Sequence, residues 1–389
     1  MNVDVDALVD QARTTTGLDD LGPDAFREGL AVLAESAARE AQFNAVGEAA
    51  FPGMLVAALA NRLRVNDWYT RHPDVATERI DAPIVVIGMF RAGTTLLSRL
   101  LDQDRGNRAL LGWEAGDSAP PPTPATHRVG PRVDAVHAGN AMLSTLNPRV
   151  DVVHREAADE ATEDISVMAQ DFKSLSWEAV ANVPAYDEWL LGVDQRSAYE
   201  YHRRVLQVLQ SGGVRGRWTL KSPHHAIALD ALTEVYPDAH LVLLHRDPVV
   251  LCGSVCGLIS TLSSTFSDAD HRAYIGRHWT AMLEESVRHI DAFRAARPER
   301  TIVDVQYTDL VADPAGTVAN IYAACGDELG DEARAAIADY VARNPKGRFG
   351  AHQYDLAEYG LDAGEIRDRF AAYSDRYTVP RESPVPSGS

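Results

Sequence analysis

Short apolar runs alternate with segments of helical periodicity from residue 83 onward. The runs are PIVVIG (83–88), RWTLK (217–221), HLVLLHR (240–246) and TIVDVQY (301–307). Continuous Val, Ile and Leu runs of this length are typical of strands buried on both faces of a parallel sheet. A stretch with apolar residues at helical intervals follows each of them. The pattern therefore predicts an α/β fold in which helices flank a parallel β-sheet.

The chain divides into three regions. Residues 1–80 show helical periodicity throughout and predict a helical N-terminal extension. Residues 81–335 form the predicted α/β core, which a largely helical insertion interrupts at about 105–215. Because insertions above a sheet commonly carry binding residues, we expect this one to form a substrate pocket. Residues 336–389 read as a basic loop followed by a flexible tail.

Composition and charge narrow the class of protein. The 389 residues carry a formal net charge of −19, which argues against a nucleic-acid surface. No apolar run reaches the roughly 18 residues of a membrane span. The acidic N-terminus lacks the features of a signal peptide, and three cysteines make no disulfide framework. We therefore expect a cytoplasmic protein without a membrane span.

The loop after the first predicted strand carries the clearest chemical signal. Gly88 and Gly93 have the spacing of a phosphate-binding loop, but Thr94 stands where such a loop of an ATPase carries lysine. A helix that begins at Thr94 and Thr95 directs backbone N–H groups toward an anion, and Arg91 adds a fixed positive charge. The sequence thus predicts a P-loop-type anion site that is poorly suited to ATP hydrolysis.

Two other strands end in basic residues. Lys221 ends the second predicted strand, and Arg246 ends the third, with Ser254 eight residues later. Ligands of α/β proteins bind at the carboxyl ends of the strands. We therefore expect Lys221 to lie at the ligand edge, and Arg246 with Ser254 to bind a second phosphate.

Together these motifs resemble the sulfotransferases that use 3′-phosphoadenosine 5′-phosphosulfate (PAPS), especially bacterial family 3, which is related to the tyrosylprotein sulfotransferases. GMFRAGTT resembles the 5′-phosphosulfate loop, HRDPVVLCGS the 3′-phosphate motif, and LKSPHH the family's lysine segment. VQYTDLVADP and NPKGRFGAHQYDL resemble two further family segments in the same order. Two departures are Phe90 and Ala92 where the loop usually has Pro and Ser, and Thr308 in place of an acidic residue.

The resemblance implies sulfuryl transfer from PAPS to a hydroxyl group, in line, with release of PAP and without a required metal. It assigns charge stabilisation at the leaving phosphate to Arg91 and Lys221. The acceptor would be a small molecule, an alcohol, phenol, sterol or glycolipid. The residues implied for nucleotide binding are Arg91, Ala92, Gly93, Thr94, Thr95, Arg246, Ser254, Tyr307, Lys346 and Arg348.

The same resemblance suggests the general base. In related branches this base is a glutamate a couple of dozen residues past the loop, which points to Glu114, 23 positions after Arg91. In the phenol and steroid branch the base is a histidine, for which His154 is the alternative. The acidic run at 155–164 reads most simply as a solvated helix face, although Glu156 or Glu160 could line the acceptor pocket.

Two other functions remain open at the level of sequence. A small-molecule kinase shares the arrangement of a loop on a parallel sheet, but it requires a loop lysine and an acidic metal-binding strand end. A non-catalytic nucleotide-binding module would keep the anion site without turnover. The sequence identifies neither the acceptor nor the oligomeric state.

Overall fold

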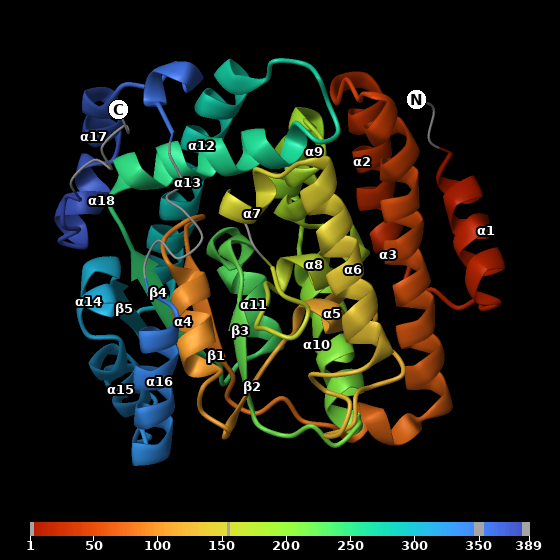
Figure 1. The fold of residues 1–389 in the computed structure, drawn as a ribbon, viewed down its shortest axis with the longest axis horizontal. Helices are drawn as coiled ribbons and strands as arrows, with labels where there is room; N and C mark the ends of the chain where they lie inside the picture. The colour runs from red at the N-terminus through yellow and green to blue at the C-terminus, as the bar shows by residue number, and fades with distance from the viewer. Residues whose placement is uncertain (1–3, 154–155, 346–353, 383–389) are drawn as a thin grey trace.

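Five parallel strands form the single sheet that organises the chain (Figure 1). The computed structural model describes residues 4–153, 156–345 and 354–382. The strands are β1 (Ile84–Gly88), β2 (Asn107–Ala109), β3 (Arg217–Lys221), β4 (His240–His245) and β5 (Ile302–Gln306), in the spatial order β2-β3-β1-β4-β5. The α/β fold predicted from sequence is confirmed. The short strand β2 was not predicted.

The register of the strands brings the predicted basic residues to one edge. Val86 of β1 pairs with Lys221 of β3, and Gly88 of β1 pairs with Leu244 of β4. All pairs in the sheet are parallel, so the carboxyl ends of β1, β3, β4 and β5 meet at the same edge. This edge therefore brings together the loop that follows β1, Lys221 at the end of β3, and Arg246 just after β4.

Alternate residues of β1 are buried in two different hydrophobic clusters, one on each face of the sheet. Ile84 and Val86 belong to the cluster that contains residues of α4 (Thr94–Leu101). Val85 and Ile87 belong to the cluster that contains residues of α10 (Arg196–Ser211). Since side chains of a strand alternate between faces, a fully apolar strand requires cover on both. The other helices that follow the strands are α11 (Leu229–Val235), α12 (Pro248–Ser263), α13 (Arg272–Ala296), α14 (Tyr307–Ala312) and α15 (Pro314–Ala324).

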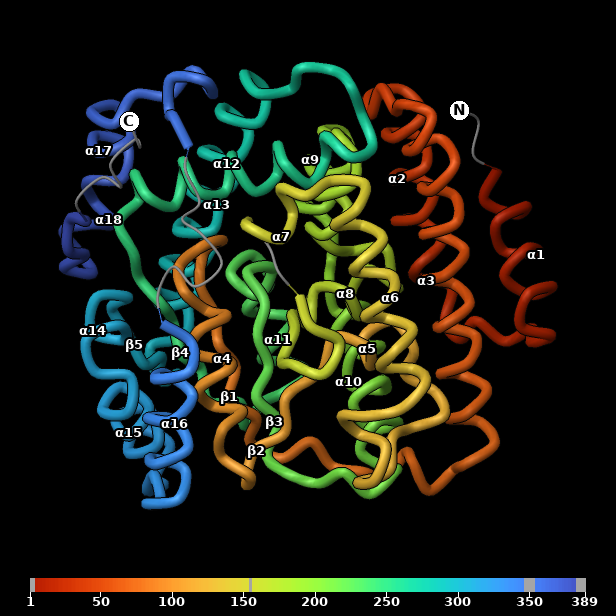
Figure 2. Tube along the Cα trace, in the orientation of Figure 1, coloured from red at the N-terminus to blue at the C-terminus, as the bar shows by residue number. Residues whose placement is uncertain are grey.

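The N-terminal helices stand at the side of the molecule away from β5, as the trace in Figure 2 shows. They are α1 (Val5–Thr16), α2 (Phe26–Glu40) and α3 (Ala45–Arg71), followed by the 3-10 turn η1 (Pro73–Thr77). The chain between β2 and β3 lies between these helices and the sheet. Its elements are α5 (Gly112–Gly116), α6 (Pro131–Leu146), α7 (Val150–Val153), α8 (Ile165–Met168), η2 (Ala169–Asp171), η3 (Leu175–Ala179), α9 (Pro184–Gly192) and α10.

The acidic segment in this region is not helical, so its interpretation as a helix face is wrong. Residues 156–164 run in irregular and turn conformation. Ala161 forms an antiparallel bridge with Leu111, and the Thr162 N–H donates to the Leu110 carbonyl at 2.8 Å. Backbone pairing with the strand-like residues before α5 therefore replaces helical hydrogen bonds here.

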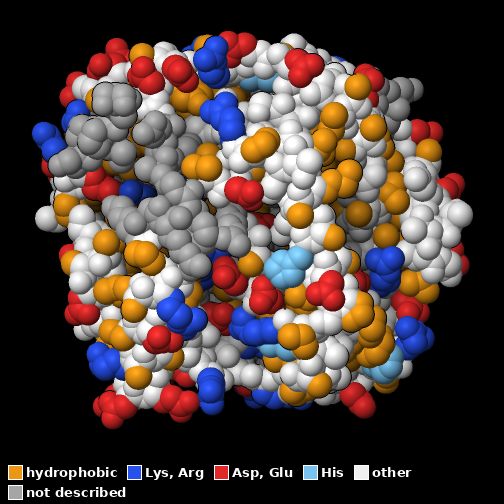
Figure 3. Space-filling model, viewed as in Figure 1, with side chains coloured by type: hydrophobic (Ala, Val, Ile, Leu, Met, Phe, Trp, Pro, Cys, Tyr) orange, Lys and Arg blue, Asp and Glu red, His pale blue; other side chains and the backbone are white. Residues whose placement is uncertain are grey.

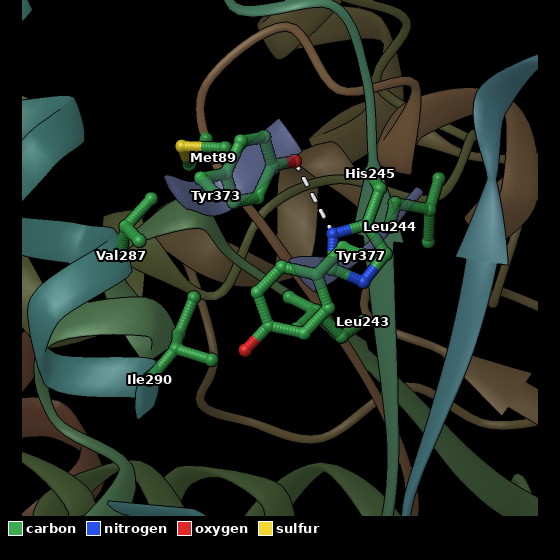
Figure 4. Close-up of a pocket in the computed structure, with 8 residues that line it drawn as sticks. All are labelled: Met89, Leu243, Leu244, His245, Val287, Ile290, Tyr373 and Tyr377. Carbon is green, nitrogen blue, oxygen red and sulfur yellow. Dashed lines mark hydrogen bonds between the residues drawn. The ribbon is translucent and has the colours of Figure 1, made fainter. Parts of the chain in front are cut away.

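The C-terminal helices pack against the end of β4 (Figure 4). The ring of His245 stacks on Tyr377 with 4.3 Å between centroids, and its Nδ1 lies 3.2 Å from the Tyr373 hydroxyl. These contacts hold α18 (Ala371–Arg376) next to Arg246. The remaining elements are η4 (Pro223–Ile227), α16 (Asp331–Arg343), η5 (Leu356–Tyr359) and α17 (Ala363–Arg369).

Charged side chains of both signs lie on the surface. Acidic and basic side chains are interspersed over the face seen in Figure 3. None of the helices in the described ranges is long and apolar enough to cross a membrane.

Candidate active site

The loop between β1 and α4 has a backbone that suits an anion. Gly93 precedes α4 with a φ of +101°, and a Cβ at this position would lie 2.6 Å from the ring of Tyr307. Arg91 has a φ of +72°, which is uncommon for a residue with a side chain. Backbone strain of this kind is often found at binding sites. The turn aims the first N–H groups of α4, at Thr94 and Thr95, toward the space in front of the sheet edge.

Arg91 and Arg246 meet at this loop. The Nη1 of Arg246 donates to the Arg91 carbonyl at 2.9 Å, and the Nε of Arg91 donates to Ser254 Oγ at 2.9 Å. The Arg246 guanidinium also lies over the ring of Tyr307, 3.8 Å from its centroid. Burial, and then the charge of Arg246, lower the pKa of Arg91. Arg246 is paired with the Glu382 carboxylate, which shows that this guanidinium is placed to hold an anion.

Lys221 reaches the same loop from β3. Its Nζ lies 3.3 Å from Thr95 Oγ1 and 2.8 Å from Glu163 Oε1, and the lysine is only 2% exposed. A buried ammonium is stabilised by such a carboxylate partner. The structure thus places a lysine beside the loop even though the loop itself contains none.

Asp164 anchors the segment that carries Glu163, through both its backbone and its side chain. The Asp164 N–H donates to the Lys221 carbonyl at 2.9 Å, which joins the two chains next to the Glu163–Lys221 pair. The buried Asp164 carboxylate faces His225 Nε2 at 3.1 Å and His202 Nε2 at 3.6 Å. Burial would raise the pKa of Asp164, but these two histidines lower it. Glu163 therefore projects from a rigid support.

A cavity of about 390 Å³ opens in front of these residues. Its charged lining includes Arg91, Glu163 and Arg246, and Thr94, Thr95 and Tyr307 also contribute. Apolar side chains complete it: Phe90, Leu96, Ile165, Leu175, Ala179, Leu258, Ile259 and Leu262. One cavity therefore combines an anion site, a carboxylate and an apolar wall. Such a combination is typical of a small-molecule site.

Glu114 lies elsewhere. Its carboxylate is fully buried and paired with Arg108, with Nη2–Oε1 at 2.6 Å and Nη1–Oε2 at 3.1 Å. Oε2 also accepts the Leu111 N–H at 3.0 Å, which caps α5. Glu114 is not among the described residues that line the cavity. Oε2 caps α5 as in a capping box, and both oxygens accept hydrogen bonds from Arg108.

The other predicted residues have mixed positions. Ala92 is buried inside the loop. Glu156 lines the cavity, whereas Glu160 forms an ion pair with Arg99 at 2.8 Å. His154, Lys346 and Arg348 lie outside the described residues.

Sequence reasoning missed Glu163 because the acidic run looked like a solvated helix face. The available signal was the final Glu-Asp pair of the run, in which Asp164 is fully buried and Glu163 lines the cavity. Lys221, which forms the ion pair with Glu163, is 58 residues away in the chain.

Known proteins share both the sequence pattern and the fold. A profile described as the sulfotransferase family matches residues 83–331. The omega-hydroxy-beta-dihydromenaquinone-9 sulfotransferase Stf3 of Mycobacterium bovis is 24% identical over 320 residues, 79% of this chain and 78% of that protein.

Two solved structures resemble nearly the whole chain. Sulfotransferase STF1 from Mycobacterium tuberculosis has a TM-score of 0.85 at 35% identity, covering 95% of this chain and 99% of its own. Sulfotransferase STF9 from Mycobacterium avium has a TM-score of 0.89 at 33% identity, covering 98% of each chain. These matches confirm the prediction of a sulfotransferase and favour it over the two alternatives, a small-molecule kinase and a non-catalytic nucleotide-binding module. By profile, sequence and structure, the chain belongs to the sulfotransferase family.

Proposed function

We propose that this sulfotransferase transfers the sulfuryl group of PAPS to the hydroxyl of an apolar small molecule and releases PAP. The observation that carries the proposal is the single cavity in which Arg91, Arg246 and the start of α4 face Glu163. PAPS supplies an activated sulfuryl group. The chain must supply anion binding, charge stabilisation and a base.

The two arginines fit the two anionic ends of the donor. Arg91 and the N–H groups of Thr94 and Thr95 suit the 5′-phosphosulfate, because a helix N-terminus and a buried guanidinium both favour negative charge. Arg246 and Ser254 suit the 3′-phosphate, and the Tyr307 ring between Gly93 and Arg246 would support the nucleotide. Ser254 already orients Arg91 through their hydrogen bond.

Lys221 takes the place of the lysine that the loop lacks. Its ammonium approaches the start of α4 from β3, next to Thr95. A cation there would stabilise the charge that develops on the departing phosphate oxygen. This explains how a loop with Thr94 in the lysine position can still support group transfer.

We propose Glu163 as the general base in place of Glu114. Glu163 lines the cavity and is held by the lysine ammonium at 2.8 Å, whereas Glu114 is enclosed by Arg108 and the α5 backbone. A base must come within hydrogen-bonding reach of the proton that it removes. Lys221 would keep the carboxylate oriented while the acceptor hydroxyl loses its proton to Glu163.

The cavity lining indicates the class of acceptor. Two elements give the cavity its apolar lining, η3 with Leu175 and Ala179 and α12 with Leu258, Ile259 and Leu262. Such a lining favours an apolar alcohol as the acceptor. The Mycobacterium bovis relative is named for an omega-hydroxylated menaquinone acceptor. We therefore propose as acceptor an apolar molecule with a terminal or exposed hydroxyl, in preference to a sugar or a peptide.

Calorimetric titration with PAP tests the donor site. We expect binding without Mg²⁺, weakened about 100-fold or more in Arg246→Ala, because a bidentate guanidinium–phosphate contact is lost. Asp375→Asn, an exposed change near the C-terminus, serves as the control that leaves PAP binding unchanged. Binding of MgATP without any binding of PAP would contradict the proposed donor.

A further inference from the structure

Three titratable side chains meet on the far side of η3 from the cavity. Glu178 comes from η3, Asp187 from α9 and His278 from α13. His278 Nε2 lies 2.8 Å from Glu178 Oε2 and 3.3 Å from Asp187 Oδ2. One ligand atom from each residue lies within 4.8 Å of the other two. Such a spacing allows all three to contact one ion.

The carboxylate oxygens of this cluster have too few donors. Asp187 is 1% exposed and Glu178 is 4% exposed. Among the described residues, Oδ1 of Asp187 and Oε1 of Glu178 have no hydrogen-bond partner, and Oδ2 of Asp187 has only the 3.3 Å contact with His278. The Tyr274 hydroxyl, whose ring stacks on His278 at 5.0 Å, is also buried without one. Buried polar atoms are rarely left unsatisfied in proteins, so this group of atoms needs a partner.

Charge balance identifies the kind of partner. Two carboxylates face a single histidine, so a protonated imidazole neutralises only one of them. A further positive charge would balance the second carboxylate when both are ionised.

We propose that Glu178, Asp187 and His278 bind one divalent transition-metal ion of the zinc class. A divalent ion would neutralise both carboxylates while the imidazole coordinates in its neutral form through Nε2. Zinc accepts imidazole nitrogen and carboxylate oxygen in a tetrahedral set, and three protein ligands leave one position for water. Magnesium is a weaker match, because it prefers six oxygen ligands and keeps most of its waters.

The ion would have a structural role. Leu175, Ser176 and Ala179 of η3 line the cavity, while Glu178 of the same turn faces the cluster. His278 is followed by Trp279, whose ring packs edge-on against Phe90 of the anion loop at 4.7 Å between centroids. A metal at the cluster would tie the wall of the cavity to α13. This inference does not depend on the identity of donor or acceptor.

Metal content tests the proposal directly. Tag-free full-length protein is stripped with a chelator, titrated with Zn²⁺ and desalted, and bound zinc is measured by mass spectrometry. We expect about one zinc per chain, and a loss of affinity of about 100-fold or more in His278→Gln and Asp187→Asn. His289→Gln on the same helix is the control, since His289 pairs with Glu285 and is no part of the cluster, and this variant should bind zinc as the parent does.

A second measurement needs no variant. Co²⁺ added to the stripped parent protein should give the intense visible absorption of a tetrahedral site, and Zn²⁺ should displace it. Thermal unfolding should shift upward on Zn²⁺ addition, because an ion that binds only the folded state stabilises it. No tight zinc and no cobalt absorption in the parent would overturn the proposal. The cluster would then be a proton-sharing triad only.

Discussion

Arg246 forms a two-point ion pair with Glu382 of the C-terminal segment. The distances are 2.7 Å from Nε to Oε1 and 3.0 Å from Nη2 to Oε2. The Glu382 N–H also donates to Asp247 Oδ2 at 2.8 Å, which fixes the backbone of the segment. A carboxylate thus occupies the guanidinium face that we assign to the 3′-phosphate of the donor.

Glu382→Gln should therefore bind PAP more tightly. The carboxylate and the phosphate use the same donor groups of Arg246, so the ion pair lowers the fraction of protein that is ready to bind. We expect the Kd for PAP to fall about three- to tenfold by calorimetry. Asp375→Asn removes one exposed negative charge of the same C-terminal region and controls for long-range electrostatics. An unchanged Kd in Glu382→Gln would show that the ion pair does not compete.

Glu163→Gln should abolish most of the turnover, with a smaller loss of stability than Glu114→Gln because Glu163 is partly exposed at the cavity. The amide keeps the shape of the side chain next to Lys221 but cannot accept the proton. General base catalysis contributes about 10² to 10⁴ in rate, so kcat should fall by that factor while PAP affinity stays within a few-fold. Turnover equal to that of the parent would remove Glu163 from the base role.

Glu114→Gln should give the opposite pattern. Removal of the charge leaves Arg108 buried beside an amide, and breaking a buried pair costs about 3 to 5 kcal/mol. We expect a lower Tm by differential scanning calorimetry and a kcat close to that of the parent. A large loss of kcat with an unchanged Tm would restore Glu114 as the base.

Acid should destabilise the protein partly through His224. This residue is fully buried, accepts the Leu175 N–H at Nδ1 and faces Gln195 through Nε2. Burial, and then the neighbouring His225, lower the pKa of His224 from 6.5 to about 3. Between these values the unfolded chain binds a proton that the native state does not. Stability is therefore lost as the pH falls from 6.5 toward 3, at most about 1.4 kcal/mol per pH unit for this group.

Urea unfolding at pH 7 and pH 5 checks this effect. His224→Gln should reduce the difference in the free energy of unfolding between the two pH values. His137→Gln on α6, whose side chain is 46% exposed, serves as the control. A pH dependence identical to that of the parent in His224→Gln would exclude its contribution.

The sequence predicts those parts of the molecule that depend on local signals. The apolar runs predicted four of the five strands, and the Gly88–Gly93 spacing predicted the loop before α4. The three-residue strand β2 escaped prediction because it is too short to show a period.

The remaining site residues depend on distant partners. The Glu163 carboxylate is held by Lys221, and the Glu114 carboxylate is held by Arg108 and the Leu111 N–H. The spacing of a glutamate from the anion loop does not show whether it acts as a base or caps a helix. The non-helical segment 156–164 pairs with the chain near Leu111, and this pairing is not visible in the spacing. Tertiary hydrogen bonding decides which carboxylate faces the cavity.

The most direct test of the central claim is a transfer assay with PAPS and a panel of apolar alcohols, read by mass spectrometry of both products. With the parent protein, we expect PAP and an acceptor that has gained one sulfuryl group to appear in equal amounts without added Mg²⁺. Glu163→Gln should form both products about 10² to 10⁴ times more slowly. Consumption of MgATP with phosphorylated acceptor, and no PAP from PAPS, would contradict the account.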